Sequence, residues 1–84
     1  MRNFKIADIE CGTSGYVDEE FYDARKPEAE RIRALYGDNG LIMLNRDLMH
    51  MNNRMMRLKD KDKDLYEDMA GQVRALRIII QEVM

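Results

Sequence analysis

The sequence has little that could cross-link the chain or anchor it in a membrane. Its 84 residues contain no tryptophan, one proline and one cysteine, so no disulfide can form within them. The longest apolar runs, Leu41–Leu44 and Ile78–Ile80, are far shorter than the roughly 20 residues of a membrane-spanning helix. The first ten residues lack the apolar stretch of a signal peptide. We therefore expect a cytoplasmic protein with no membrane segment.

The charge balance excludes one class of function, and the composition indicates a folded chain. Lysine and arginine number 14 and aspartate and glutamate 16, a net charge of −2, whereas proteins that wrap duplex DNA are strongly basic. Hydrophobic residues make up 45% of the chain and charged residues 36%, as in folded domains. A chain of this length forms at most one small domain.

Few residues could carry catalysis or hold a metal ion. The only histidine is His50, and the only cysteine is Cys11, which precedes a short loop with two glycines. A nucleophilic cysteine needs a neighbouring base, and a metal site needs several suitably spaced ligands, but the sequence has neither pattern. Met49 and Met51 flank His50, yet adjacent helical residues point about 100° apart and do not converge on one ion. We expect no enzymatic activity, no cofactor and no metal.

Residues 1–40 are expected to form a small N-terminal cap. Phe4–Glu10 could be a short strand or an extended arm, and a loop follows it. Asp18 is placed to N-cap a helix. Pro27 interrupts a helix there or opens a second one, and Glu28–Tyr36 has a single apolar helical face. Gly37 stands where a helix C-cap belongs, within a turn of two glycines, Asp and Asn.

Residues 41–84 carry the strongest pattern in the sequence. With Leu41 at position a of a heptad, 11 of the 13 a and d positions are apolar, and no proline interrupts the run. This spacing predicts a coiled coil or a long helix. A helix of 44 residues would be about 66 Å long, more than twice the diameter of a compact chain of this size. The stripe therefore needs a second long helix to cover it.

Two architectures would supply that second helix. The helix could run unbroken and pair with a copy of itself, or the chain could turn back at Lys59–Asp64 and form a hairpin. We favour the unbroken helix, because Lys59–Asp64 has no glycine or proline and Leu58 and Leu65 keep the heptad phase across it. Asp62 and Gln72 would then be polar core positions that select the register.

The fold class that follows is mainly α: the N-terminal cap of residues 1–40, then one long helix in an oligomeric coiled coil or bundle, as one structural unit. We expect a homodimer. Antiparallel pairing or a higher oligomer is somewhat favoured over a parallel dimer, because parallel pairing would set Arg54 opposite Lys59. The residues expected to form its seam are Leu44, Leu48, Met51, Met55, Leu58, Leu65, Met69, Leu76 and Ile79.

Two surfaces are candidates for binding a partner protein. One is an acidic cluster in the N-terminal cap, which could engage a basic surface. The other is the C-terminal end of the long helix, which is apolar over more than half of its circumference. The candidate residues are Asp18, Glu19, Glu20 and Asp23 in the cluster and Ile78, Ile80 and Val83 at the C-terminal end.

The function that these patterns favour is non-enzymatic: a homo-oligomeric helical scaffold that binds and regulates or inhibits a partner protein. A short acidic helical chain is also the format of many phage-encoded inhibitors of host enzymes, including anti-CRISPR proteins, an analogy of size and composition that would make this a viral protein. The alternative is a nucleic-acid-associated regulator. Its basic residues would be Arg46, Arg54, Arg57 and Lys61 on the long helix.

Overall fold

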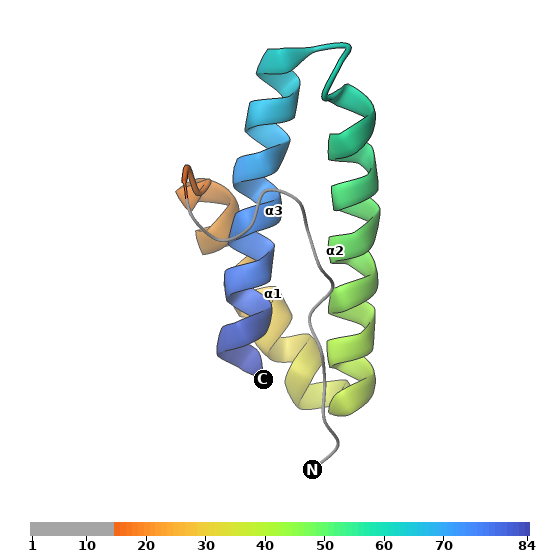
Figure 1. Cartoon of the computed structure of the whole chain (residues 1–84). Helices are drawn as coiled ribbons and strands as arrows, with labels where there is room; N and C mark the ends of the chain where they lie inside the picture. The colour runs from red at the N-terminus through yellow and green to blue at the C-terminus, as the bar shows by residue number, and fades with distance from the viewer. Residues whose placement is uncertain (1–14) are drawn as a thin grey trace.

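Three packed helices form the described part of this computed structural model, which covers residues 15–84. They are α1 (Glu19–Tyr36), α2 (Asp38–Leu58) and α3 (Lys63–Val83) (Figure 1). The expected mainly α fold is therefore confirmed for these residues. The possible strand at Phe4–Glu10 and the loop residue Cys11 lie outside the described residues. No helix within residues 15–84 combines the length and apolarity needed to cross a bilayer.

Helix α1 begins at the predicted cap and is longer than its apolar pattern predicted. The Asp18 side chain accepts a hydrogen bond from the Phe21 amide at 3.0 Å, which satisfies one unpaired donor of the first turn. Pro27 lies inside the helix instead of ending it or opening a second one. Proline has no amide hydrogen, so the Asp23 carbonyl, four residues earlier, loses its helical hydrogen bond. Both Asp23 and Pro27 are exposed, so water can take the place of the missing donor.

A single residue, Gly37, separates α1 from α2. Its φ of +59° is left-handed backbone that favours glycine. The Gly37 amide donates to the Arg33 carbonyl at 2.9 Å, and the Gly40 amide donates to the Gly37 carbonyl at 3.0 Å. The predicted C-cap of α1 is therefore confirmed, and α2 starts at once in a new direction.

The expected continuous helix over residues 41–84 is wrong, because the chain turns back after Leu58 as in the hairpin alternative. The amides of Lys61 and Asp62 donate to the Leu58 carbonyl at 3.1 and 2.9 Å, which closes the end of α2. Asp62 is extended, with φ of −147°, and its side chain accepts from the Leu65 amide at 3.2 Å. Asp62 is therefore an N-cap and not a polar core position.

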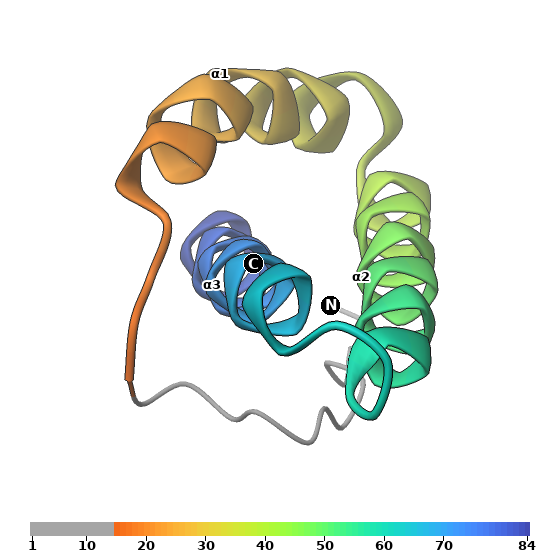
Figure 2. The ribbon, with the colours of Figure 1, turned by 90° about the horizontal axis from the view of Figure 1, so that it is seen from above.

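Helix α3 packs against both other helices, which lie on two sides of it (Figure 2). The core contains the largest fully buried side chains of α2 and α3, and Ala29 of α1 joins them. The heptad stripe that predicted a second copy is thus covered mostly by the chain itself. The fully buried large residues are Leu44, Leu48, Met55, Val73, Leu76, Ile79 and Ile80.

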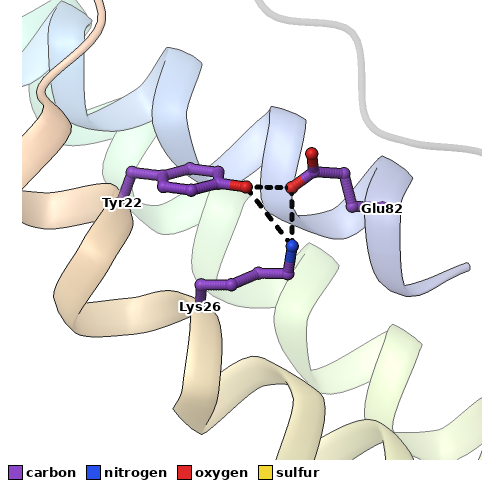
Figure 3. A network of polar contacts seen from close by, with 3 residues as sticks. All are labelled: Tyr22, Lys26 and Glu82. Carbon is purple, nitrogen blue, oxygen red and sulfur yellow. Dashed lines mark hydrogen bonds and ion pairs between the residues drawn. The ribbon is translucent and has the colours of Figure 1, made fainter.

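Polar contacts attach α1 to the last turn of α3. Glu82 accepts hydrogen bonds from the Tyr22 hydroxyl and from Lys26 Nζ, the latter at 2.9 Å (Figure 3). Arg33 Nε donates to the Val83 carbonyl at 3.1 Å. Together these contacts place the end of α3 beside α1. The Asp18 amide donates to the Gly71 carbonyl at 3.2 Å, which places the start of α1 beside the middle of α3.

Candidate binding groove

A groove of about 340 Å³ opens where the three helices meet. Each helix contributes to its wall, and the lining mixes apolar, basic, acidic and amide side chains. We call it the three-helix groove. Its lining residues are Phe21 and Arg25 of α1, Asp47, His50, Met51 and Arg54 of α2, and Met69 and Gln72 of α3.

The α1 wall consists of Phe21 and Arg25, which are four residues apart and therefore on one helical face. The Arg25 guanidinium lies 5.5 Å from the centre of the Phe21 ring, within the range of a cation–π contact. It also lies 3.8 Å from the carboxylate of Asp47 and 4.0 Å from that of Glu28. These contacts hold Arg25 over the mouth of the groove, with a third of its side chain exposed.

The α2 wall follows from helical spacing. Asp47, His50, Met51 and Arg54 are at positions i, i+3, i+4 and i+7, so they form one ridge along α2. Met51 is half-buried and packs against the core, whereas the other three are exposed. The sequence thus sets an apolar side chain at the base of the groove and polar side chains at its rim.

The floor of the groove is soft and apolar. Met51 and Met69 approach it from α2 and α3, and both are half-buried against the core together with Phe21. Thioethers are flexible and polarizable, so this floor can adapt to differently shaped apolar groups. Gln72 adds an amide that can donate and accept hydrogen bonds.

The charge of the rim is positive on balance. Arg25 and Arg54 bring two cations and His50 an imidazole, against the single carboxylate of Asp47, which already faces Arg25. Within the part of the chain that the structure describes, neither His50 nor Arg54 has an ion pair. These two basic groups therefore retain their capacity to bind an acidic group.

No protein-family model matches this sequence, and neither a curated protein nor a solved structure is significantly similar to the chain. A functional interpretation therefore depends on the geometry of residues 15–84. Within this range, no cluster of three or more histidine, cysteine, aspartate or glutamate side chains is arranged to hold a metal ion.

The predicted seam residues divide into two groups in the structure. Leu44, Leu48, Met55, Leu76 and Ile79 are fully buried inside one chain. The other four retain exposed surface. Met51, Leu58 and Met69 are half-buried, and Leu65 is 49% exposed.

The predicted acidic cluster lies at the start of α1, and none of its four residues lines the three-helix groove. Asp18 is the N-cap, and Glu19, Glu20 and Asp23 are exposed in the first turns. Asp18 raises the pKa of the Tyr16 phenol, with smaller contributions from burial and from other carboxylates. A hollow of about 480 Å³ lies along residues 16–20. Helix capping accounts for the Asp18 side chain, while the others are open to solvent.

The apolar C-terminal end is less accessible than the sequence indicated. Ile80 is fully buried, and Ile78 and Val83 are half-buried. Val83 packs against the core, and its carbonyl accepts the hydrogen bond from Arg33. The three-helix packing explains this, because the face of α3 that was expected to meet a partner packs against α1 and α2 instead.

The basic candidates of the alternative hypothesis are exposed. Arg46, Arg54 and Arg57 are spaced by eight and three residues, so they share the outward side of α2, and Lys61 lies in the following turn. Only Arg54 reaches the three-helix groove. The arginines therefore form a stripe that begins at the groove and continues over the surface of α2.

Sequence reasoning did not find most of the groove. Phe21, Arg25, Asp47, His50 and Gln72 were not expected to act together, because they come from three helices whose packing was not known. One signal was present: Phe21, Arg25 and Ala29 are spaced by four residues across Pro27, which indicates one helix face.

Proposed function

We propose that this chain is a non-enzymatic interaction module that binds a partner protein through the three-helix groove and thereby regulates or inhibits it. The observation that carries the proposal is the composition of the groove. An apolar floor of Phe21, Met51 and Met69 is surrounded by the basic side chains of Arg25, His50 and Arg54. Interaction sites combine an apolar anchor point with polar rim groups in this way, and Met and Arg are enriched in them.

The shape of the groove favours a segment of protein over an enclosed small molecule. A volume of about 340 Å³ is at the lower end of the range for small-molecule sites, and the groove is open along its rim, where Asp47, His50 and Arg54 are all exposed. One or two side chains of a partner would fill it while the rest of the partner lies across the surrounding helices.

A peptide selection tests this proposal. The folded chain is immobilised, a library of random 12-residue peptides is displayed against it, and an enriched peptide is titrated into isotope-labelled protein. We expect chemical-shift changes to centre on Met51, Arg54 and Met69. Arg54→Glu weakens binding, whereas Arg46→Glu, on α2 but outside the groove, changes it little. Shifts that centre elsewhere, or the absence of any enriched peptide, contradict the proposal.

A homodimer remains a prediction that needs a different interface from the one expected. The five buried seam residues already pack within one chain, so only the surfaces outside this core can join two copies. Light scattering across a concentration series measures the mass directly. The cytoplasmic location and the viral inhibitor role also remain predictions.

A second candidate function, a nucleic-acid-associated regulator, is favoured by the arginine stripe on α2. Arg46, Arg54 and Arg57 present three cations along one exposed helix face, suited to contacts with phosphates. Binding to a labelled 20-base-pair duplex would then weaken steeply between 50 and 200 mM salt. Arg46→Gln would weaken it as much as Arg54→Gln does. No binding at 50 mM salt eliminates this candidate.

A further inference from the structure

The apolar floor of the three-helix groove continues toward the turn between α2 and α3. Leu58 lies seven residues after Met51 and so occupies the same side of α2, and Leu65 lies four residues before Met69 on α3. We call Met51, Leu58, Leu65 and Met69 the turn-side strip. None of the four is fully buried, and Leu65 is 49% exposed.

The turn-side strip prolongs the surface on which α1 packs. Phe21, the third residue of α1, lines the groove together with Met51 and Met69. The hairpin extends beyond this end of α1 toward its turn (Figure 1). The same face of the hairpin that holds α1 therefore continues past it, and no helix within residues 15–84 covers it there.

Charges of opposite sign flank this strip. Arg54 and His50 lie on the α2 side, and Arg25 lies at the groove end. On α3, Asp64 and Asp68 are four residues apart, adjacent in sequence to Leu65 and Met69, and both are exposed. A docked helix would meet basic groups along one edge and acidic groups along the other.

We propose that the turn-side strip binds an amphipathic helix of a partner protein, with acidic side chains on the edge that faces α2 and basic side chains on the edge that faces α3. This inference rests on the proposed function and specifies the partner's chemistry. An apolar helix face in a hydrophobic groove is a common mode of peptide recognition. The opposite charges of the two edges fix the direction in which the helix lies.

The test uses a display library of helical peptides of about 14 residues, roughly 21 Å long. Leucines are fixed along one face, and the two edges are randomised among Glu, Lys and Gln. We expect the enriched peptides to carry Glu on one edge and Lys on the other. Against the His50→Gln/Arg54→Gln protein the preference for Glu is lost, and against the Asp64→Asn/Asp68→Asn protein the preference for Lys is lost.

Two protein variants check the location. Leu65→Glu places a charge in the apolar contact and should weaken binding by about tenfold or more, while its exposure lets the circular dichroism spectrum remain that of the wild type. Arg46→Gln lies outside the strip and leaves binding unchanged. Enriched peptides with no edge preference, or with binding insensitive to Leu65→Glu, overturn the inference.

The remaining outcomes separate this inference from the proposed function. If random peptides bind the groove but no helical peptide is enriched, the inference fails and the proposed function stands. If neither library yields a binder, both fail. If sedimentation velocity detects self-association that Leu65→Glu abolishes, the occupant is a second copy of this chain and the inference is overturned.

Discussion

The backbone of Gly40 lies directly against the backbone of Ile32. A Cβ atom added at Gly40 would come within 2.6 Å of the Ile32 carbonyl oxygen and 3.1 Å of its carbonyl carbon. Gly40 is buried near the start of α2, and Ile32 is near the end of α1. The close approach of these two backbones sets how α1 crosses α2, and thereby where Phe21 and Arg25 meet the hairpin.

Gly40→Ala should therefore destabilise the protein. Alanine in a helix is ordinarily more favourable than glycine by about 0.5–1 kcal/mol. Here the Ile32 carbonyl is main chain and has little room to move, so we expect a net loss of about 1–3 kcal/mol in the free energy of unfolding. Urea denaturation followed by circular dichroism measures the change.

Asn39→Ala provides the control for this substitution. Asn39 is the neighbouring residue of α2 and is exposed, so its replacement should change stability by no more than about 0.5 kcal/mol. Equal or greater stability of Gly40→Ala would show that α1 does not approach α2 at this point.

Two leucines at predicted core positions of the heptad, Leu48 at a and Leu65 at d, should differ sharply in their contribution to stability. Leu48 is fully buried, and its truncation to alanine should cost about 2–5 kcal/mol. Leu65 is 49% exposed, so Leu65→Ala should cost less than about 1 kcal/mol. Chemical denaturation of the two variants tests this. Similar losses would mean that Leu65 is buried in solution, as it would be in a stable oligomer.

The heptad pattern predicted helical structure over residues 41–84 and part of the core, but not the turn that divides this segment into α2 and α3. The a and d pattern identified Leu44, Leu48, Met55, Leu76 and Ile79, all of which are buried. A heptad pattern records only which side of a helix is apolar. A hairpin whose turn has a suitable length keeps the same seven-residue spacing, so the spacing of Leu58 and Leu65 could not distinguish it from a continuous helix.

The groove was harder to predict from the sequence than the fold was. Arg54 was identified only as a basic residue of the alternative function, and His50 only as the single histidine of the chain. Their joint position with Arg25 depends on α1 continuing through Pro27, and proline usually indicates an interruption. Because α1 is one helix of 18 residues that continues through Pro27, Phe21 and Arg25 lie beside the middle of α2.

Glu82 should make the stability depend on pH in the acidic range. Hydrogen bonds from Tyr22 and then Lys26 lower the pKa of the Glu82 carboxyl below its ordinary value near 4.5. The unfolded chain therefore binds this proton more readily than the folded chain does. The stabilisation is complete above the ordinary value and is lost as the pH falls through the lowered pKa.

Comparison of the wild type with Glu82→Gln isolates this effect. The urea midpoint of the wild type should exceed that of the variant at pH 7, and the difference should shrink toward pH 2.5. Glu67→Gln, which alters an exposed carboxylate on the same helix, should show no such trend. A difference that stays constant down to pH 2.5 would contradict the Tyr22–Lys26–Glu82 contacts.

The same contacts raise the pKa of Lys26, first through its hydrogen bond with Glu82. The contribution of Lys26 to stability is therefore lost only at alkaline pH, as the pH rises above about 10.5.

Asp62→Ala distinguishes the hairpin from a continuous helix by the sign of its effect. In the hairpin the Asp62 side chain accepts a hydrogen bond from the Leu65 amide and caps α3, so its loss should cost about 1 kcal/mol. In an unbroken helix the same change would replace a poor helix former with the best one and raise stability.

Asp62→Ser keeps an N-cap and should stay near the wild type, while Asp60→Ala alters an exposed turn residue and serves as the control. Urea midpoints and the helical signal at 222 nm report the outcome. A gain in both for Asp62→Ala would mean that the chain does not turn after Leu58, and the three-helix groove would not form.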